Sequence, residues 1–74
     1  TLSDDLIGRR IRAYRKLKGY TQQGLAEALG ISVAVIGAIE RGTRTPKKQL
    51  LEDVARTLQV DVEELLTDTS QTHS

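Results

Sequence analysis

The sequence predicts an all-α domain built from five short helices. Apolar residues recur every three to four positions along most of the chain, which places them on one face of a helix. Helix-capping residues precede these segments, and glycines follow several of them. The run 33–36 could form a strand, but it follows a capping serine and continues with helical spacing. We therefore expect helices at about 4–18, 22–29, 33–41, 46–58 and 62–66.

The first helix is expected to begin after Ser3. A serine hydroxyl can accept from the exposed amides of the first turn, and the acidic residues that follow suit the helix dipole. Gly19 is expected to end the helix in a left-handed conformation. The predicted apolar stripe consists of Ile7, Ile11, Tyr14 and either Leu17 or Lys18.

The second and third helices have matching signals. Thr21 and Ser32 precede them as caps, while Gly30 and Gly42 follow them. Gly24, near the start of the second helix, weakens it by roughly 1 kcal/mol relative to alanine. The residues expected to face the core are Leu25, Ala26, Leu29, Ile36 and Ile39.

The last two helices are also predicted from caps and apolar spacing. Thr45 is expected to cap the fourth helix, with Pro46 in its first turn. Asp61 and Glu64 have the spacing of a capping box for the fifth. The residues expected to face inward are Leu50, Leu51, Val54, Leu58, Val62, Leu65 and Leu66. Residues 67–74 contain no apolar side chain and are expected to form a disordered tail.

The length and composition predict one domain, residues 1–66, with an aliphatic core. The 74 residues include no Cys, Phe, Trp or Met and only two Tyr. The lack of cysteine excludes disulfides and thiolate metal sites within this sequence. No apolar run approaches the roughly 20 residues of a membrane span, so no membrane partner is expected.

The sequence argues against an enzyme. The single histidine, His73, lies in the predicted tail. Ser3 and Ser32 are explained as helix caps, since no base is placed to activate either hydroxyl. The carboxylates on the last two helices are typical of a solvent-exposed helix face. The glycines do not have the spacing of a phosphate-binding loop. We expect no catalytic residue, no metal and no cofactor.

The formal net charge of +1 conceals a strong gradient along the chain. Residues 1–48 carry a net charge of +6, whereas residues 49–74 carry −5. A partner meets a local surface rather than the total charge, so the first part is suited to a polyanion. On charge alone, a solvated surface with random clustering is an equally good explanation.

The segment 21–42 consists of two short helices joined by a tight turn around Gly30. Over residues 7–66 the chain resembles the phage-repressor helix-turn-helix proteins, the Cro-type or XRE family. The matching positions are Ile7, Ile11, Arg12, Arg15, Gly19, Tyr20, Thr21, Gln22, Leu25, Ala26, Leu29, Gly30, Ile31, Ser32, Ile36, Ile39, Glu40, Arg41, Gly42, Pro46, Val60, Glu64, Leu65 and Leu66. The fold implied is a compact five-helix DNA-binding domain.

This resemblance also implies roles for particular residues. The helix at 33–41 would enter the major groove with its first residues at base edges. Gln22 would hold a backbone phosphate at the start of the second helix. Arg15 would either contact a phosphate or pair internally with Glu40, and we favour the internal ion pair.

The recognition helix departs from the family pattern. Polar base-reading residues are common where this chain has Val33, Ala34, Gly37 and Ala38. These positions offer no side-chain donor or acceptor, although methyl groups can contact thymine methyls. Ser32, Gln23, Arg41 and Arg44 would then supply direct or flanking contacts, with DNA shape contributing further specificity. Lys47 and Lys48 are a second departure, and both could reach phosphate.

Three explanations of the apolar recognition helix remain open. The protein binds DNA with affinity carried mainly by phosphates, which the basic first part favours. Alternatively, Val33, Ala34 and Ala38 form an exposed patch that docks a protein partner. In the third explanation, the patch is partly buried within the domain or a dimer.

We expect a DNA-binding transcriptional repressor in the cytoplasm of a bacterium or acting for a phage. Its partner is double-stranded DNA, and the resemblance implies a homodimer on a pseudo-palindromic operator. The expected DNA-binding residues are Gln22, Gln23, Ser32, Val33, Ala34, Gly37, Ala38, Arg41 and Arg44. The alternative function is a helix-turn-helix module that binds a protein, as a coactivator or antagonist.

Overall fold

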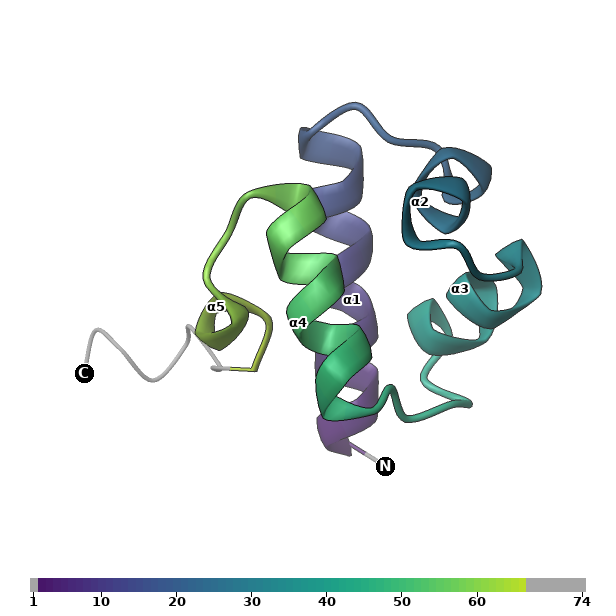
Figure 1. Cartoon of the computed structure of the whole chain (residues 1–74). Helices are drawn as coiled ribbons and strands as arrows, with labels where there is room; N and C mark the ends of the chain where they lie inside the picture. The colour runs from purple at the N-terminus through teal and green to yellow at the C-terminus, as the bar shows by residue number, and fades with distance from the viewer. Residues whose placement is uncertain (1, 67–74) are drawn as a thin grey trace.

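The computed structural model describes residues 2–66, with side chains from residue 5 onward, as a bundle of five helices (Figure 1). The helices are α1 (Leu2–Leu17), α2 (Gln22–Leu29), α3 (Val33–Glu40), α4 (Lys48–Leu58) and α5 (Val62–Leu66). The long helices α1 and α4 pack together in the middle, with α2 and α3 on one side and α5 on the other. The predicted all-α class is confirmed. The predicted tail, including His73, lies outside the described residues.

The core is aliphatic, as the composition predicts. Its buried residues come from every helix and are Ile11, Leu25, Ala26, Ile36, Ile39, Leu51, Val54, Ala55, Leu58 and Leu65. Arg15 is the one buried charged residue among those that the structure describes. Removing apolar surface from water at about 25 cal/mol per Å² is the main force that holds short helices such as α2 and α3 in place.

Two predictions for α1 are wrong. The helix begins at Leu2, so Ser3 lies inside its first turn and is not the residue that precedes it. Leu17 does not continue the buried stripe, because its side chain is 75% exposed. Two successive steps of three residues, from Ile11 to Tyr14 to Leu17, rotate the stripe by about 120° and carry it out of the core.

The start of α4 also differs from the prediction. The helix begins at Lys48 with Lys47 as its N-cap residue, and Lys47 makes no side-chain capping bond. Pro46 is buried, and the backbone remains extended through Lys47, with φ −72° and ψ 160°. Thr45 is therefore not the cap, because packing of the proline ring holds the chain extended for two more residues.

The expected capping box of α5 is replaced by contacts to α1. The Glu64 carboxylate accepts a hydrogen bond from the Tyr14 hydroxyl at 2.6 Å, and the Glu64 carbonyl accepts from Arg10 at 3.3 Å. Leu65 is fully buried, whereas Leu66 is 51% exposed, so the prediction that Leu66 faces inward is wrong. A helix of one and a half turns presents only one side to the core.

No single helix in the part of the chain described is long and apolar enough to cross a membrane. The pair α2 and α3 reaches the required length and composition only when taken together across its bend of 116°.

Candidate nucleic-acid interface

The helices α2 and α3 form the predicted helix-turn-helix. Thr21 Oγ1 accepts from the Gly24 amide at 2.9 Å, and Ser32 Oγ accepts from the Val35 amide at 3.3 Å. Gly30 ends α2 in the left-handed region, with φ 74°, so the chain reverses direction in three residues. The bend of 116° between the two helices lies within the range of about 90–120° seen in helix-turn-helix motifs.

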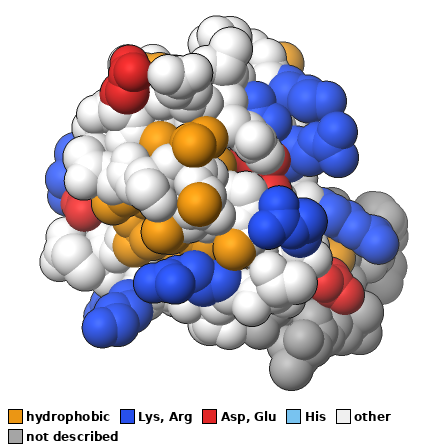
Figure 2. Space-filling model, turned by 90° about the vertical axis from the view of Figure 1, so that its right-hand side faces the viewer, with side chains coloured by type: hydrophobic (Ala, Val, Ile, Leu, Met, Phe, Trp, Pro, Cys, Tyr) orange, Lys and Arg blue, Asp and Glu red, His pale blue; other side chains and the backbone are white. Residues whose placement is uncertain are grey.

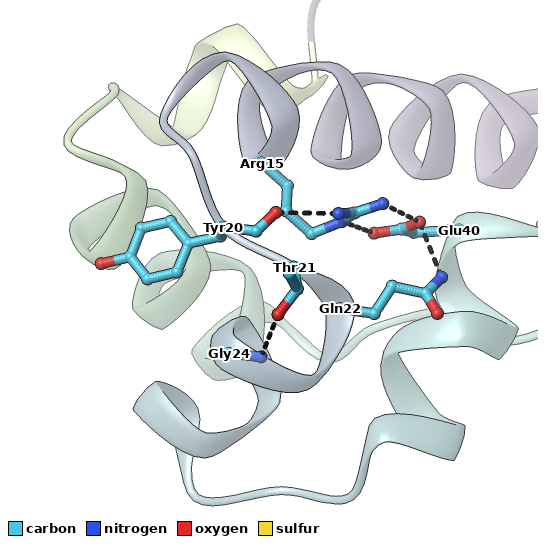
Figure 3. Close-up of polar contacts among 6 residues, drawn as sticks. All are labelled: Arg15, Tyr20, Thr21, Gln22, Gly24 and Glu40. Carbon is cyan, nitrogen blue, oxygen red and sulfur yellow. Dashed lines mark hydrogen bonds and ion pairs between the residues drawn. The ribbon is translucent and has the colours of Figure 1, made fainter.

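An ion pair between α1 and the end of α3 fixes this motif to the rest of the domain (Figure 3). Arg15 Nε lies 2.6 Å from Glu40 Oε2, and Arg15 Nη2 lies 3.2 Å from Glu40 Oε1. The exposed fractions of the two side chains are 8% and 3%. In this structure Arg15 therefore forms the internal ion pair, and its charge is balanced by Glu40.

The same carboxylate also holds the start of α2. Gln22 Nε2 donates to Glu40 Oε1 at 3.0 Å, and Arg15 Nη1 donates to the Tyr20 carbonyl at 2.9 Å. Figure 3 shows the side chains of Arg15 from α1 and Gln22 from α2 converging on Glu40, while the Tyr20 carbonyl of the loop between them faces the Arg15 guanidinium. A buried carboxylate with several charge-assisted hydrogen bonds has a defined position. We therefore infer that the relative orientation of α1, α2 and α3 depends on Glu40.

The outward surface of α3 is apolar near its start. Val33 is 44% exposed, Ala34 is exposed and Ala38 is half-buried. Within this single chain Val33 and Ala34 are therefore not buried in the domain, and the explanations by DNA, by a protein partner and by burial in a dimer remain. Gly37, the remaining predicted contact on this helix, is buried.

A groove of about 640 Å³ lies where α1, α2 and α3 meet. Four of its residues are predicted DNA contacts, and its remaining charged side chains are positive once Arg15 and Glu40 are paired. The groove is lined by Arg12, Arg15, Tyr20, Thr21, Gln22, Gln23, Val33, Glu40 and Arg41. Figure 2 shows hydrophobic side chains in the middle of the face that carries α2 and α3, with Lys and Arg side chains on either side.

Arg12 is a candidate contact that the sequence analysis did not single out. It is exposed and lines this groove beside Arg41 and Gln22. The sequence did contain one indication of this: Arg12 precedes Arg15 by three residues, so the two side chains are neighbours on one face of α1.

Arg44 lies elsewhere, in a second groove of about 410 Å³ between α2 and the start of α4. This groove has an apolar floor and an exposed basic rim, and it is lined by Leu29, Ile31, Arg44, Thr45, Pro46, Lys47, Gln49, Leu50 and Asp53. The predicted contacts are thus divided: Gln22, Gln23, Val33 and Arg41 share one groove, and Arg44 lies in the other.

The described residues contain no cluster of three or more His, Cys, Asp or Glu side chains that could hold a metal ion.

Comparison with known proteins places these features in a family. Residues 11–65 match the HTH_3 family, described as helix-turn-helix. The chain is 56% identical over 61 residues to an uncharacterised HTH-type transcriptional regulator, YazB, of Bacillus subtilis. That match covers 82% of this chain and 88% of YazB.

Solved structures of SinR, named as the master regulator for biofilm formation, are also similar. In its complex with DNA, SinR is 44% identical to this chain with a TM-score of 0.78, covering 82% of this chain and 98% of that one. In its complex with the SinI protein it is 40% identical with a TM-score of 0.81, covering 92% and 67%. The match to the whole SinR sequence of Bacillus subtilis, at 43% identity, covers 90% of this chain and 61% of SinR.

Proposed function

The chain belongs to the HTH_3 family of helix-turn-helix proteins, and we propose that it is a DNA-binding transcriptional regulator. In this proposal α3 enters the major groove of duplex DNA, and the surrounding basic side chains hold the phosphates. The proposed role is repression, in the cytoplasm, without catalysis.

The observation that carries this proposal is the exposed start of α3 beside a basic groove. Val33 and Ala34 project outward from a helix whose N-terminus is capped by Ser32. The B-DNA major groove, about 12 Å wide, admits one such helix. The neighbouring cations Arg12 and Arg41 are exposed and line the adjoining groove.

The distribution of charge supports the same orientation. Residues 49–74 carry a net charge of −5, and α5 lies on the opposite side of α1 and α4 from α3 (Figure 1). With α3 in the groove, α5 faces away from the phosphates. The side near α3 presents Arg44, Lys47 and Lys48, all exposed. These exposed cations on the side near α3 favour this docked orientation over the reverse, although Asp53 lines the same groove as Arg44 and Lys47.

In this proposal Gln22 contacts a backbone phosphate, and its hydrogen bond to Glu40 supports that role. The side chain is already held at the start of α2, where free backbone amides favour an anion. Its position is therefore set before DNA arrives, which lowers the entropy lost on binding a phosphate.

We also propose that the protein acts as a homodimer on a pseudo-palindromic site. Two copies of α3 would lie about 34 Å apart, one turn of DNA. Leu66 is the exposed apolar residue of α5 and is available for a contact between copies. If α5 forms this contact, Leu66→Glu leaves binding to one half-site unchanged and removes cooperative binding to two half-sites. Unchanged cooperativity would place the dimer contact elsewhere.

The test of DNA binding is selection of bound duplexes from a random pool at low salt, followed by a salt titration of the selected duplex. The logarithm of the binding constant should fall linearly with the logarithm of salt, by about 0.9 per phosphate neutralised. Failure to bind any duplex at low salt would rule the proposal out.

The apolar surface of α3 favours one alternative, a module that binds a protein through Val33, Ala34 and Ala38. The exposed side chain of Val33 gives this surface of α3 an apolar patch on which a partner protein could dock. In that case binding of the partner would depend weakly on salt, and the protein would not retain duplex DNA at low salt.

A further inference from the structure

We propose that Arg41 reads a guanine in the major groove, and that Gly37 leaves the space through which its side chain reaches the DNA. This inference rests on the proposed DNA-binding function and adds a specific base contact to it. It accounts for sequence discrimination by a recognition helix whose own outward side chains are apolar.

The position of Arg41 along the helix places it on the DNA-facing surface. Arg41 is the C-cap residue of α3 and retains helical backbone angles, with φ −82° and ψ −7°. It follows Gly37 by four residues and Ala34 by seven, so all three lie close to one line along the helix. Ile36 and Ile39, on the opposite side, are fully buried.

The direction of the Arg41 side chain follows from the same geometry. Side chains of a helix lean toward its N-terminus and cover the preceding turn. A Cβ atom built at Gly37 would lie 3.1 Å from Arg41 Nη1, so the guanidinium lies over Gly37. Gly37 is buried although its helix surface faces outward, which agrees with a side chain covering it. Arg41 and Val33, at the two ends of α3, also line the same groove.

The guanidinium is free to bind a base. Glu40, its neighbour in sequence, is fully used by Arg15 and Gln22. Within the described residues, Arg41 makes no hydrogen bond or ion pair through its side chain. The side chain is exposed and lines the groove together with Arg12, Gln22 and Val33.

The chemistry of the guanidinium selects the base. Its planar donors match the O6 and N7 acceptors of guanine, which is the commonest specific contact of arginine in the major groove. The other exposed side chains of α3 present methyl groups, which favour thymine. We therefore expect a half-site in which one guanine contacts Arg41 and adjacent thymines contact Val33 or Ala34.

The test compares the full chain with Arg41→Ala, Gly37→Ala and the control Arg56→Ala, at an exposed position on α4. Each protein selects duplexes from a random pool, and affinities for the selected site are measured with the guanine intact, replaced by adenine or replaced by 7-deazaguanine. In the unsubstituted protein, both replacements should weaken binding, and adenine should do so by about 5- to 150-fold.

Arg41→Ala removes the donors to guanine O6 and N7, so it should lose most of the preference for guanine. It should also bind the 7-deazaguanine and guanine sites equally. Gly37→Ala should shift the guanidinium and reduce the guanine preference, with a normal thermal unfolding transition. Arg56→Ala should retain the preference of the unsubstituted protein.

Three results would overturn the inference while leaving DNA binding intact. They are a selected site without a preferred guanine, an unchanged guanine preference in Arg41→Ala, and an equal loss of preference in Arg56→Ala. An unchanged preference in folded Gly37→Ala would overturn the role of Gly37. If no duplex is retained even by the unsubstituted protein at low salt, the proposed function itself is wrong.

Discussion

Tyr14 and Arg15 are neighbours on α1, yet they join this helix to opposite sides of the domain. Arg15 binds Glu40 of α3 through two hydrogen bonds that are almost completely buried. Tyr14 binds Glu64 of α5 through one hydrogen bond of 2.6 Å near the surface. The two contacts look alike in sequence, as a donor on α1 and a distant glutamate, but they differ in burial.

This difference in burial indicates which interactions hold α3 and α5 to α1. On the α3 side, a buried charge must keep its partner, because an unpaired ion in the interior is very unfavourable. On the α5 side, water can replace a broken hydrogen bond, and buried Leu65 supplies most of the attachment. The DNA-facing side should therefore be sensitive to polar substitutions, and the other side to apolar ones.

The largest expected effect is that of Glu40→Ala. It leaves the Arg15 guanidinium buried without a partner and should lower the free energy of unfolding by about 3–5 kcal/mol. Denaturant unfolding of Glu40→Ala, Arg15→Ala and the double variant measures the coupling energy between the two side chains. A coupling energy near zero would show that the buried pair does not hold α3.

Gly8→Ala should have the next largest effect. A Cβ atom at Gly8 would overlap the Ile39 carbonyl oxygen and lie 2.8 Å from the Glu40 carbonyl oxygen, so α1 and α3 must move apart. Overpacking of this kind destabilises by roughly 1–3 kcal/mol. Gly37→Ala is the matched control, since its new methyl group meets only the ends of two flexible side chains, Arg41 and Gln22. Equal unfolding midpoints for the two variants would contradict the close helix approach.

Gln59→Gly should stabilise the α4–α5 side. Gln59 ends α4 with φ 61°, a left-handed conformation that is unfavourable for a residue with a Cβ atom. Glycine adopts it without strain, and after the entropy of the unfolded chain is counted the gain should be about 0.5–1 kcal/mol. Gln59→Ala, which keeps the Cβ atom, is the control. A lower midpoint for the glycine variant than for the alanine variant would contradict this prediction.

Tyr14→Phe should have the smallest effect, below about 1 kcal/mol, since the hydrogen bond it removes lies near solvent. The pKa of Tyr14 is raised above its ordinary value of 10.0, mainly by its hydrogen bond to Glu64 and then by burial and the Glu64 charge. The contact therefore stabilises the protein fully at neutral pH. This stabilisation is lost as the pH rises above 10 through the folded-state pKa.

Unfolding of wild type and Tyr14→Phe from pH 7 to 11 measures this dependence. The difference in stability should be constant at neutral pH and shrink above pH 10. A constant difference throughout would mean that the hydroxyl does not interact with Glu64 in the folded protein.

Much of the fold could be predicted from local signals. Thr21 and Ser32 cap their helices, and Gly19, Gly30 and Gly42 all have positive φ at helix ends. These features depend on a few adjacent residues. The position of Pro46 and the exposure of Leu17 and Leu66 depend on which side of a segment meets the core, which local spacing does not determine.

The candidate site was only partly predictable for the same reason. The pairing of Arg15 with Glu40 followed from the family resemblance. The third partner, Gln22, and the placement of Arg41 over Gly37 depend on side-chain directions across three helices. A glycine on an apolar helix gives no sign in the sequence that an arginine four residues later covers it.

The measurement that tests the central claim most directly is binding of Ala34→Glu and Ala28→Glu to the selected duplex. Both alanines are exposed and on the helix-turn-helix, and each substitution adds one negative charge. Ala34 is on the outward surface of α3, whereas Ala28 lies about 140° around α2 from Gln23, which lines the basic groove. If α3 enters the major groove, Ala34→Glu weakens binding strongly and Ala28→Glu has little effect. If both folded variants bind the duplex as tightly as the unsubstituted protein, α3 is not in the groove.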